Sequence, residues 1–203
     1  MSHPYSVNLR ERQIVYFVLA ALAFACSIVI GRLLLLISWT PPGWLDIPGA
    51  FTLFGLLCWW FERQLWKMPL VRSLGVRTPI LEGQWSGSVT SMVFGHLTET
   101  PVSVAIHQGW TTISFILSTE HSRSESTAAA IRIGPETTII YCYENRPNTM
   151  SASTMHAHEG TATLRLTAAG LSGDYYSGRD RANSGTIILR RQESAGQPKP
   201  NAS

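Results

Sequence analysis

The hydrophobic pattern of this chain changes from long apolar runs to residue-by-residue alternation near residue 80. Residues 14–31 (IVYFVLAALAFACSIVIG) carry no charge, and the run continues past Arg32 to Ile37. A second run, Trp44–Phe61, contains only Asp46. A helix needs about 20 apolar residues to cross a bilayer core of about 30 Å. The first run therefore predicts a membrane span. The second predicts a marginal span that must thin the bilayer, lean on its neighbour or oligomerise.

The flanking charges predict how these spans are oriented. Arg10 and Arg12 precede the first span, and the turn at residues 38–43 has no Lys or Arg. Four cations follow the second span: Arg63, Lys67, Arg72 and Arg77. Because cytoplasmic loops are enriched in Lys and Arg, we expect both termini in the cytoplasm. A cleaved signal peptide or a buried core hairpin is disfavoured, because no small-residue cleavage site follows and both runs are apolar all round.

Three further features of the apolar runs concern how they pack. Ala23, Ser27 and Gly31 form a ridge of small residues at spacing four, which permits close helix approach. The ridge serves either self-association or, as we favour, packing against the second run of the same chain. Arg32 either snorkels to the outer interface or pairs with Asp46. Five tryptophans are placed for interfacial belts: Trp39, Trp44, Trp59, Trp60 and Trp66.

From Leu81 the apolar residues recur at every second position, which predicts strands. Turn residues such as Gly134–Pro135 and Ala169–Gly170 separate the runs. We expect eight antiparallel strands forming a sandwich or a closed barrel. The predicted strands are Gln84–Ser91, Val102–Gln108, Thr111–Ser118, Ser126–Ile133, Thr137–Tyr143, Gly160–Thr167, Leu171–Tyr176 and Thr186–Arg191.

The two ends of this region favour the barrel. Gly83 and Trp85 open the first strand, and Arg191 closes the last. This pattern resembles the Gly-x-Trp start of lipocalin-type barrels, in which an arginine of the final strand packs over the tryptophan. A large aromatic ring fills the end of a barrel, and a guanidinium stacks on its face. The alternative is an ordinary core tryptophan.

The chain therefore divides into five parts. They are a cytoplasmic N-terminus at 1–12, a two-helix transmembrane hairpin at 13–67, a basic linker at 68–79, a β-barrel at 80–191 and a disordered tail at 192–203. Residues 1–79 carry net charge +4 and residues 80–203 net −1. The basic excess suits anionic lipid headgroups, and the barrel lacks the charge that nucleic acid polymers require. Three cysteines without a zinc or disulfide spacing suit a reducing cytoplasm.

The combination of these features resembles a known family. Two N-terminal spans precede Leu-Glu-Gly-Gln-Trp-Ser-Gly (81–87), and the chain ends in Leu-Ser-Gly-Asp-Tyr (171–175) and Gly-Thr-Ile-Ile-Leu-Arg-Arg (185–191). These look like the two-transmembrane, β-strand-rich effectors of bacterial CBASS antiphage immunity. The resemblance implies a barrel on the cytoplasmic side of the inner membrane that binds a cyclic oligonucleotide made by a partner nucleotidyltransferase. It further implies ligand-driven self-association and membrane damage that kills the infected cell.

A cyclic oligonucleotide needs aromatic or guanidinium faces for its bases and arginines or amides for its phosphates. Tyr141 and Tyr143 share one face of a predicted strand, and Tyr175 lies near the end of another. Other candidates are Arg132, Arg179 with Arg181 in the last hairpin, and Trp110 beside a turn. Each has a structural alternative: a core ring for the aromatic residues and a solvated tip for the hairpin arginines. The inward strand faces are undetermined, because a one-residue slip inverts them.

Other chemistry is poorly supported. His156 and His158 share a strand face, but no further ligands are evident, so we expect no metal or other cofactor. No nucleophile elbow, P-loop or dinucleotide fingerprint occurs, so we expect no enzyme. Two alternative functions stay open. The barrel could hold a lipid or another small apolar ligand, or the chain could be a scaffold subunit of a membrane complex.

Overall fold

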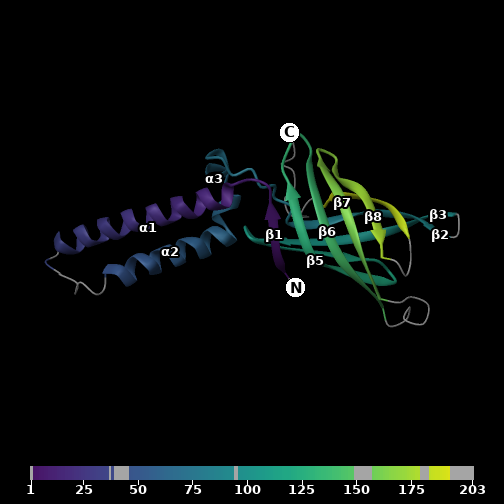
Figure 1. Cartoon of the computed structure of the whole chain (residues 1–203), viewed down its shortest axis with the longest axis horizontal. Coiled ribbons are helices and arrows are strands. Elements are labelled where there is room, and N and C mark those ends of the chain that lie inside the picture. The colour runs from purple at the N-terminus through teal and green to yellow at the C-terminus, as the bar shows by residue number, and fades with distance from the viewer. Residues whose placement is uncertain are drawn as a thin grey trace, which may run out of the picture. The chain divides into compact units, whose positions relative to one another are not determined.

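The computed structural model describes residues 2–36, 38, 46–93, 96–148, 157–178 and 183–192, with the side chains of 46–48, 92, 93 and 96 left out. The chain separates into two compact units, labelled in Figure 1 by their helices and strands. The helical unit contains residues 7–80 and 109–111, and the barrel unit contains residues 1–6, 81–108 and 112–203. Residues 109–111 connect two barrel strands, yet they cluster with the helices.

The helical unit contains α1 (Glu11–Leu36), α2 (Asp46–Arg63), the 3₁₀ turn η2 (Leu65–Lys67) and the short α3 (Pro69–Ser73). α1 and α2 lie side by side (Figure 1). Among the described helices, α1 alone is long and apolar enough to cross a membrane, with a mean hydropathy of 2.6. Only 11% of that stretch is buried, whereas the core helix of a soluble protein is mostly buried. α2 does not meet the same test, so the expected second span stays a prediction.

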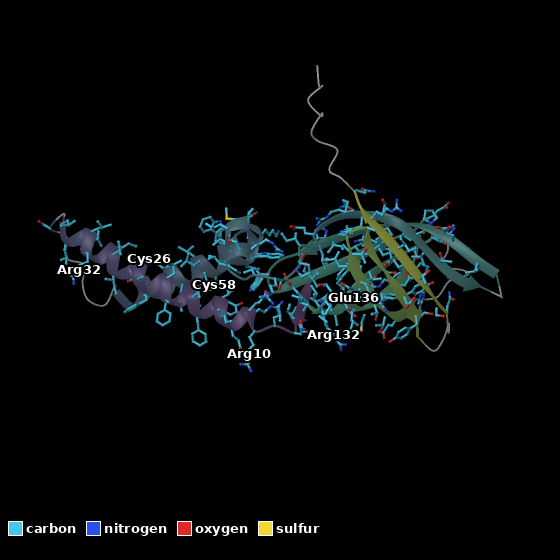
Figure 2. The ribbon with its side chains drawn as sticks, turned by 90° about the horizontal axis from the view of Figure 1, so that it is seen from above. Arg10, Cys26, Arg32, Cys58, Arg132 and Glu136 are labelled. Atoms are coloured by element: carbon cyan, nitrogen blue, oxygen red, sulfur yellow. The ribbon has the colours of Figure 1, made fainter. Side chains whose placement is uncertain are left out.

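The ridge of small residues lies on the least exposed side of α1. Ala23 is buried, and Ser27 and Gly31 are partly buried, while most neighbouring positions are exposed. A Cβ added at Gly31 would meet nothing within 4 Å, so no close helix approach requires a glycine there. Figure 2 labels Arg10 and Arg32 near opposite ends of α1. The proposed pairing of Arg32 with Asp46 involves a side chain outside those described.

A compact aromatic cluster forms the core of the helical unit. Trp110 stands edge-on to Phe61, with 5.2 Å between ring centroids, and lies 5.7 Å from the ring of Trp66. Leu19 and Val76 complete the buried cluster. The expected interfacial role of Trp66 is therefore wrong, because its side chain is fully buried. Trp59 and Trp60 are exposed, and Trp39 and Trp44 lie outside the described residues.

The barrel unit is a closed sheet that contains all eight predicted strands. They are β2 (Gly83–Val93), β3 (His96–Gln108), β4 (Thr112–Ser118), β5 (Ser122–Arg132), β6 (Thr137–Pro147), β7 (His158–Thr167), β8 (Gly170–Ser177) and β9 (Ser184–Arg191). Each strand pairs antiparallel with the next along the chain, and β9 pairs with β2. Most strands are longer than the sequence predicted, because polar residues near the loops continue the ladders.

A ninth strand corrects the predicted topology. β1 (His3–Val7) lies between β4 and β5 in the strand order, and it pairs antiparallel with β4. Because β5 is also antiparallel to β4, β1 runs parallel to β5, and the barrel is mixed rather than all-antiparallel. The N-terminus was expected outside the barrel. Five residues that include His and Pro showed no alternation by which the strand could be recognised.

β1 fills a seam where β4 and β5 separate. Those two strands pair only between Ile116–Ser118 and Arg123–Glu125, and β5 then bulges between Ser126 and Ala128. Ser126 Oγ accepts the N–H of Phe115 at 2.9 Å and lies 2.7 Å from His3 Nε2. One hydroxyl therefore joins three strands where the regular ladder stops.

One end of the barrel, here called the base, is filled by large side chains. Trp85 Nε1 donates to the Leu81 carbonyl at 2.9 Å, and the Arg191 guanidinium lies 5.3 Å from the Trp85 ring. Gly83 adopts φ +135°, a conformation that glycine adopts without strain, directly beneath the Arg191 side chain. The structure thus brings together the three residues expected to close the barrel.

Candidate ligand cavity of the barrel

The opposite end of the barrel, here called the mouth, is hollow. It is the end where β2–β3, β4–β5, β6–β7 and β8–β9 connect. The cavity has a volume of about 270 Å³. Its lining comprises Val89, Ser91, Thr98, Thr100, Phe115, Leu117, Thr119, His121, Ser122, Ser124, Tyr141, Tyr143, Asn145, His158, Tyr175, Ser177, Asn183 and Ile187.

A stacked aromatic pair forms the floor. The rings of Phe115 and Tyr141 are parallel within 5°, with 4.6 Å between centroids. Burial raises the pKa of the Tyr141 phenol, and the neighbouring Tyr143 raises it further. The Tyr141 hydroxyl therefore stays protonated at physiological pH and presents a neutral hydrogen-bonding group. A neutral floor suits an uncharged ring better than a phosphate.

Two further tyrosine rings line the wall, and each lies close to a glycine of the next strand. A Cβ at Gly160 would lie 2.4 Å from the Tyr143 phenol, and one at Gly185 would lie 2.8 Å from the Tyr175 ring. Both added carbons would also meet backbone oxygen of an adjacent strand. The glycines therefore leave the space that lets these rings lie against the wall. Tyr143 is inclined by 54° to Tyr141, at 6.2 Å.

Amide and hydroxyl groups surround the upper part of the cavity. Asn145 is buried, and its Oδ1 accepts from the Ser124 hydroxyl at 3.1 Å. Ser177 and Asn183 bridge the ends of the β8–β9 connection through two hydrogen bonds at 3.1 Å. The buried Oδ1 of Asn183 has no hydrogen-bond partner among the described residues. An acceptor of this kind suits the amino group of a ligand.

The described lining carries no Asp, Glu, Lys or Arg. Its titratable side chains are His121, His158 and the three tyrosines. Apolar side chains such as Val89, Leu117 and Ile187 cover part of its wall. The cavity therefore matches flat, largely neutral groups that bear hydrogen-bonding edges, and any charged part of a ligand must lie nearer the mouth.

The predicted ligand contacts fall in different places. Tyr141, Tyr143 and Tyr175 are brought together in the cavity. Arg132 is exposed on the outside of β5, at the end of that strand away from the mouth, and is labelled in Figure 2. Trp110 belongs to the helical unit, where it is 1% exposed. Arg179 lies outside the described residues, between Ser177 and Asn183, which both line the cavity.

Several cavity residues were not predicted. Phe115, Asn145 and the hydroxyl groups of β3 and β5 escaped notice because the inward face of each strand was unknown. The sequence did contain a signal, because the inward-facing positions change from apolar to polar toward the mouth. Along β6 the inward residues change from Ile139 through Tyr141 and Tyr143 to Asn145.

Comparison with known proteins finds matches that cover the barrel. A family model described as the Cap15 cyclic dinucleotide receptor domain matches residues 76–191, which is more than half of the chain and includes β2 to β9. CD-NTase-associated protein 15 of Yersinia aleksiciae is 30% identical over 143 residues, covering 67% of this chain and 66% of that protein. The chain thus matches slightly less than two thirds of the length of that relative.

Proposed function

The chain belongs to the family with the Cap15 cyclic dinucleotide receptor domain, and from that premise we propose that its barrel senses a cyclic dinucleotide during antiphage defence. The observation that carries the proposal is the hollow mouth, where three tyrosines lie within the matched residues. Each base stacked on an aromatic side chain contributes about 1–3 kcal/mol. Neutral amides and hydroxyls supply the edges that distinguish one base from another.

The volume of the cavity limits how much of a ligand it can hold. Cavities that enclose drug-sized ligands measure roughly 300–1,000 Å³. The described cavity of about 270 Å³ is at the lower edge of that range, and a cyclic dinucleotide has two bases, two riboses and two phosphates. One base and its ribose fit against the tyrosines, while the second base and the phosphates lie at the mouth.

The phosphates need positive charge or N–H donors. The described lining contains no lysine or arginine. The β8–β9 connection carries Arg179 and Arg181, and Ser177 and Asn183, at its two ends, line the cavity. We assign the phosphates to these two arginines. His121 and His158 supply further donors at the same end.

In this proposal the helices carry out the response to ligand binding. α1 meets the length and hydropathy of a span, and α2 leaves Phe51, Leu56 and Trp59 more than half exposed. Apolar side chains at this exposure require lipid or another protein around them. We propose that both helices cross the inner membrane with the barrel in the cytoplasm, and that ligand binding drives self-association and membrane disruption. A nucleotidyltransferase would supply the ligand.

The first test is binding of cyclic di- and trinucleotides to the full chain in lipid nanodiscs, measured by calorimetry. The full chain is needed because a barrel that starts at residue 79 would lack β1. We expect one cyclic dinucleotide to bind. Tyr175→Ala should weaken binding by about 5- to 150-fold, which corresponds to the loss of one stacked base. Tyr176→Ala is the matched control, because the neighbouring ring points outward and is 58% exposed.

Equal affinity of both variants, or no binding of any nucleotide by folded protein, contradicts the proposed site. The second test adds the bound nucleotide to vesicles that contain the full chain and follows release of an entrapped dye and the oligomeric state. Ligand binding without dye release or self-association would leave the sensor intact and remove the proposed membrane action.

A lipid ligand is the alternative for the same cavity. Its apolar side chains favour that reading, but several serine, threonine and asparagine side chains also line the cavity. Burying an acyl chain against such groups would leave their hydrogen bonds unmade. Native mass spectrometry of the purified chain distinguishes the two, because a bound acyl chain has a defined mass and would compete with the nucleotide.

A further inference from the structure

The segment that follows α2 exposes large apolar side chains outside the two long helices. It comprises residues 65–74, which include η2 and α3, and is here called the foot. Met68 is 47% exposed, Leu70 75% and Leu74 82%. Three such side chains within seven residues form a patch that water solvates poorly. Another surface must therefore cover the outer side of the foot.

The other side of the foot is anchored in the helical unit. Trp66 is fully buried, and its Nε1 donates to the Glu62 carbonyl at 3.2 Å. Leu65 and Val71 pack against the same aromatic cluster. The foot is consequently held in one orientation, and the exposure of its leucines is a property of the fold rather than of a loose end.

The charge of the surrounding segment indicates which kind of surface covers the foot. Residues 63–81 contain four cations (Arg63, Lys67, Arg72 and Arg77) and no Asp or Glu. Two carboxylates from outside the segment have hydrogen-bond partners in the helical unit. Glu11 accepts hydrogen bonds from the backbone N–H groups of Arg77 and Thr78, and Glu62 accepts from Thr111. Residues 63–81 by themselves therefore carry a net charge of +4, which attracts an anionic surface.

The foot also continues directly from a helix end with interfacial character. Trp59 and Trp60, in the last turns of α2, are about half exposed, and the Arg63 guanidinium lies 4.5 Å from the Trp59 ring. Tryptophan and arginine in this arrangement are typical of the boundary between acyl chains and headgroups. Only one residue separates α2 from the foot.

We propose that the foot lies in the headgroup region of an anionic bilayer, with Met68, Leu70 and Leu74 inserted and the four cations of residues 63–81 against lipid phosphates. This inference rests on the proposed membrane location of the helices, not on nucleotide binding. Apolar insertion and headgroup attraction act together in interfacial segments, since neither alone anchors a short helix. The foot then fixes the depth at which α2 meets the cytoplasmic surface.

The test is amide hydrogen exchange of the full chain in nanodiscs of phosphatidylcholine alone or mixed with phosphatidylglycerol. The reporters are the amides of Arg72, Leu74 and Gly75, which bond to carbonyls within the foot. We expect their exchange to slow by about 25-fold in the anionic bilayer, since each of the two cations within the foot contributes a factor of about five near such a surface. The double substitution Leu70→Ser with Leu74→Ser should abolish the slowing.

Two control variants separate the contributions. Leu97→Ser changes a leucine of β3 that is 74% exposed, and it should leave exchange of the foot unchanged. Lys67→Gln with Arg77→Gln should reduce the effect of the anionic lipid while leaving exchange in phosphatidylcholine unaltered. Nucleotide affinity measured on the same samples reports separately on the barrel.

Equal exchange in both bilayers, unaffected by the leucine substitutions, overturns the proposal. Slowing that appears only when the chain self-associates would assign the patch to a second copy, which also overturns it. Fast exchange throughout α1 as well would mean that the helices are not in the bilayer. The proposal for the foot and the proposed membrane location would then both be wrong.

Discussion

The base and the mouth of the barrel are built from the same strands but are filled differently. At the base the inward side chains are large and apolar, such as Ile113, Ile139 and Leu164, and all three are fully buried. At the mouth the same strands turn inward hydroxyl and amide groups, and a cavity of about 270 Å³ is left. Apart from the seam between β4 and β5, the same strand ladders run through both halves, so side-chain identity decides which half is solid and which half can hold a ligand.

The two ends also contribute differently to folding stability and to ligand binding. Packed apolar side chains supply folding stability, whereas a hollow lined with polar groups gives up part of that stability for recognition. Substitutions at the base should therefore change the free energy of unfolding, and substitutions at the mouth should change affinity.

The largest effect is expected for Trp85→Ala at the base. Trp85 is 4% exposed, bonded to the Leu81 carbonyl and covered by Arg191. Removing a buried tryptophan side chain typically costs about 3–5 kcal/mol of the free energy of unfolding. Calorimetric unfolding of the full chain in nanodiscs measures the change. Trp59→Ala, on α2, is the control and should leave the barrel transition unaltered; a loss below about 1 kcal/mol for Trp85→Ala would contradict a tryptophan-closed base.

The second prediction fills the mouth so that it resembles the base. Thr100 is an inward residue of β3 that lines the cavity and pairs across the strands with Val89. Thr100→Trp should occupy the hollow and weaken nucleotide binding by about a hundredfold or more, about 2.8 kcal/mol. Because the cavity is open, the barrel transition should move little. Undiminished affinity in a folded Thr100→Trp variant would show that the nucleotide binds elsewhere.

The division between base and mouth also explains what the sequence could predict. Alternation revealed all eight strands of residues 83–191, and it placed Tyr141 and Tyr143 on one face. It did not say which face is inward, because that depends on register across the whole barrel. Arg132 was proposed as a ligand contact for this reason, although its strand carries it outside and away from the mouth.

The position of Trp110 and the existence of β1 depended on contacts between distant parts of the chain. Trp110 follows a glycine in a turn between strands, where a ring could be exposed or buried; its packing on Phe61 and Trp66 arises from helices far away in sequence. β1 escaped prediction because its partner seam exists only once β4 and β5 have separated. Both cases reflect tertiary context rather than local propensity.

The third prediction concerns the seam, which lies between the solid and hollow halves. Ser126→Ala removes the acceptor of the buried Phe115 N–H and the partner of His3. An unmade buried hydrogen bond costs about 1–3 kcal/mol. We expect a loss in that range on thermal unfolding, with faster amide exchange in β1 and β4. Ser172→Ala, on the outer face of β8, should change stability by less than about 0.5 kcal/mol, and an equal effect of both would contradict the special role of Ser126.

The smallest effect is expected for Tyr141→Phe, and it should appear only at alkaline pH. Burial raises the pKa of Tyr141 above that of an exposed phenol, so the folded chain keeps a proton that the unfolded chain releases. The stability from this neutral phenol is complete below about pH 10, and it falls by about 1.4 kcal/mol per pH unit as pH rises from there toward the raised pKa of the folded state. Tyr141→Phe should lack this fall while resembling the unsubstituted chain at pH 7. Unfolding measured from pH 7 to pH 11 gives the two slopes, and Tyr176→Phe, an exposed ring, is the control. Identical slopes for the unsubstituted chain and Tyr141→Phe would mean that the floor of the mouth is hydrated rather than packed.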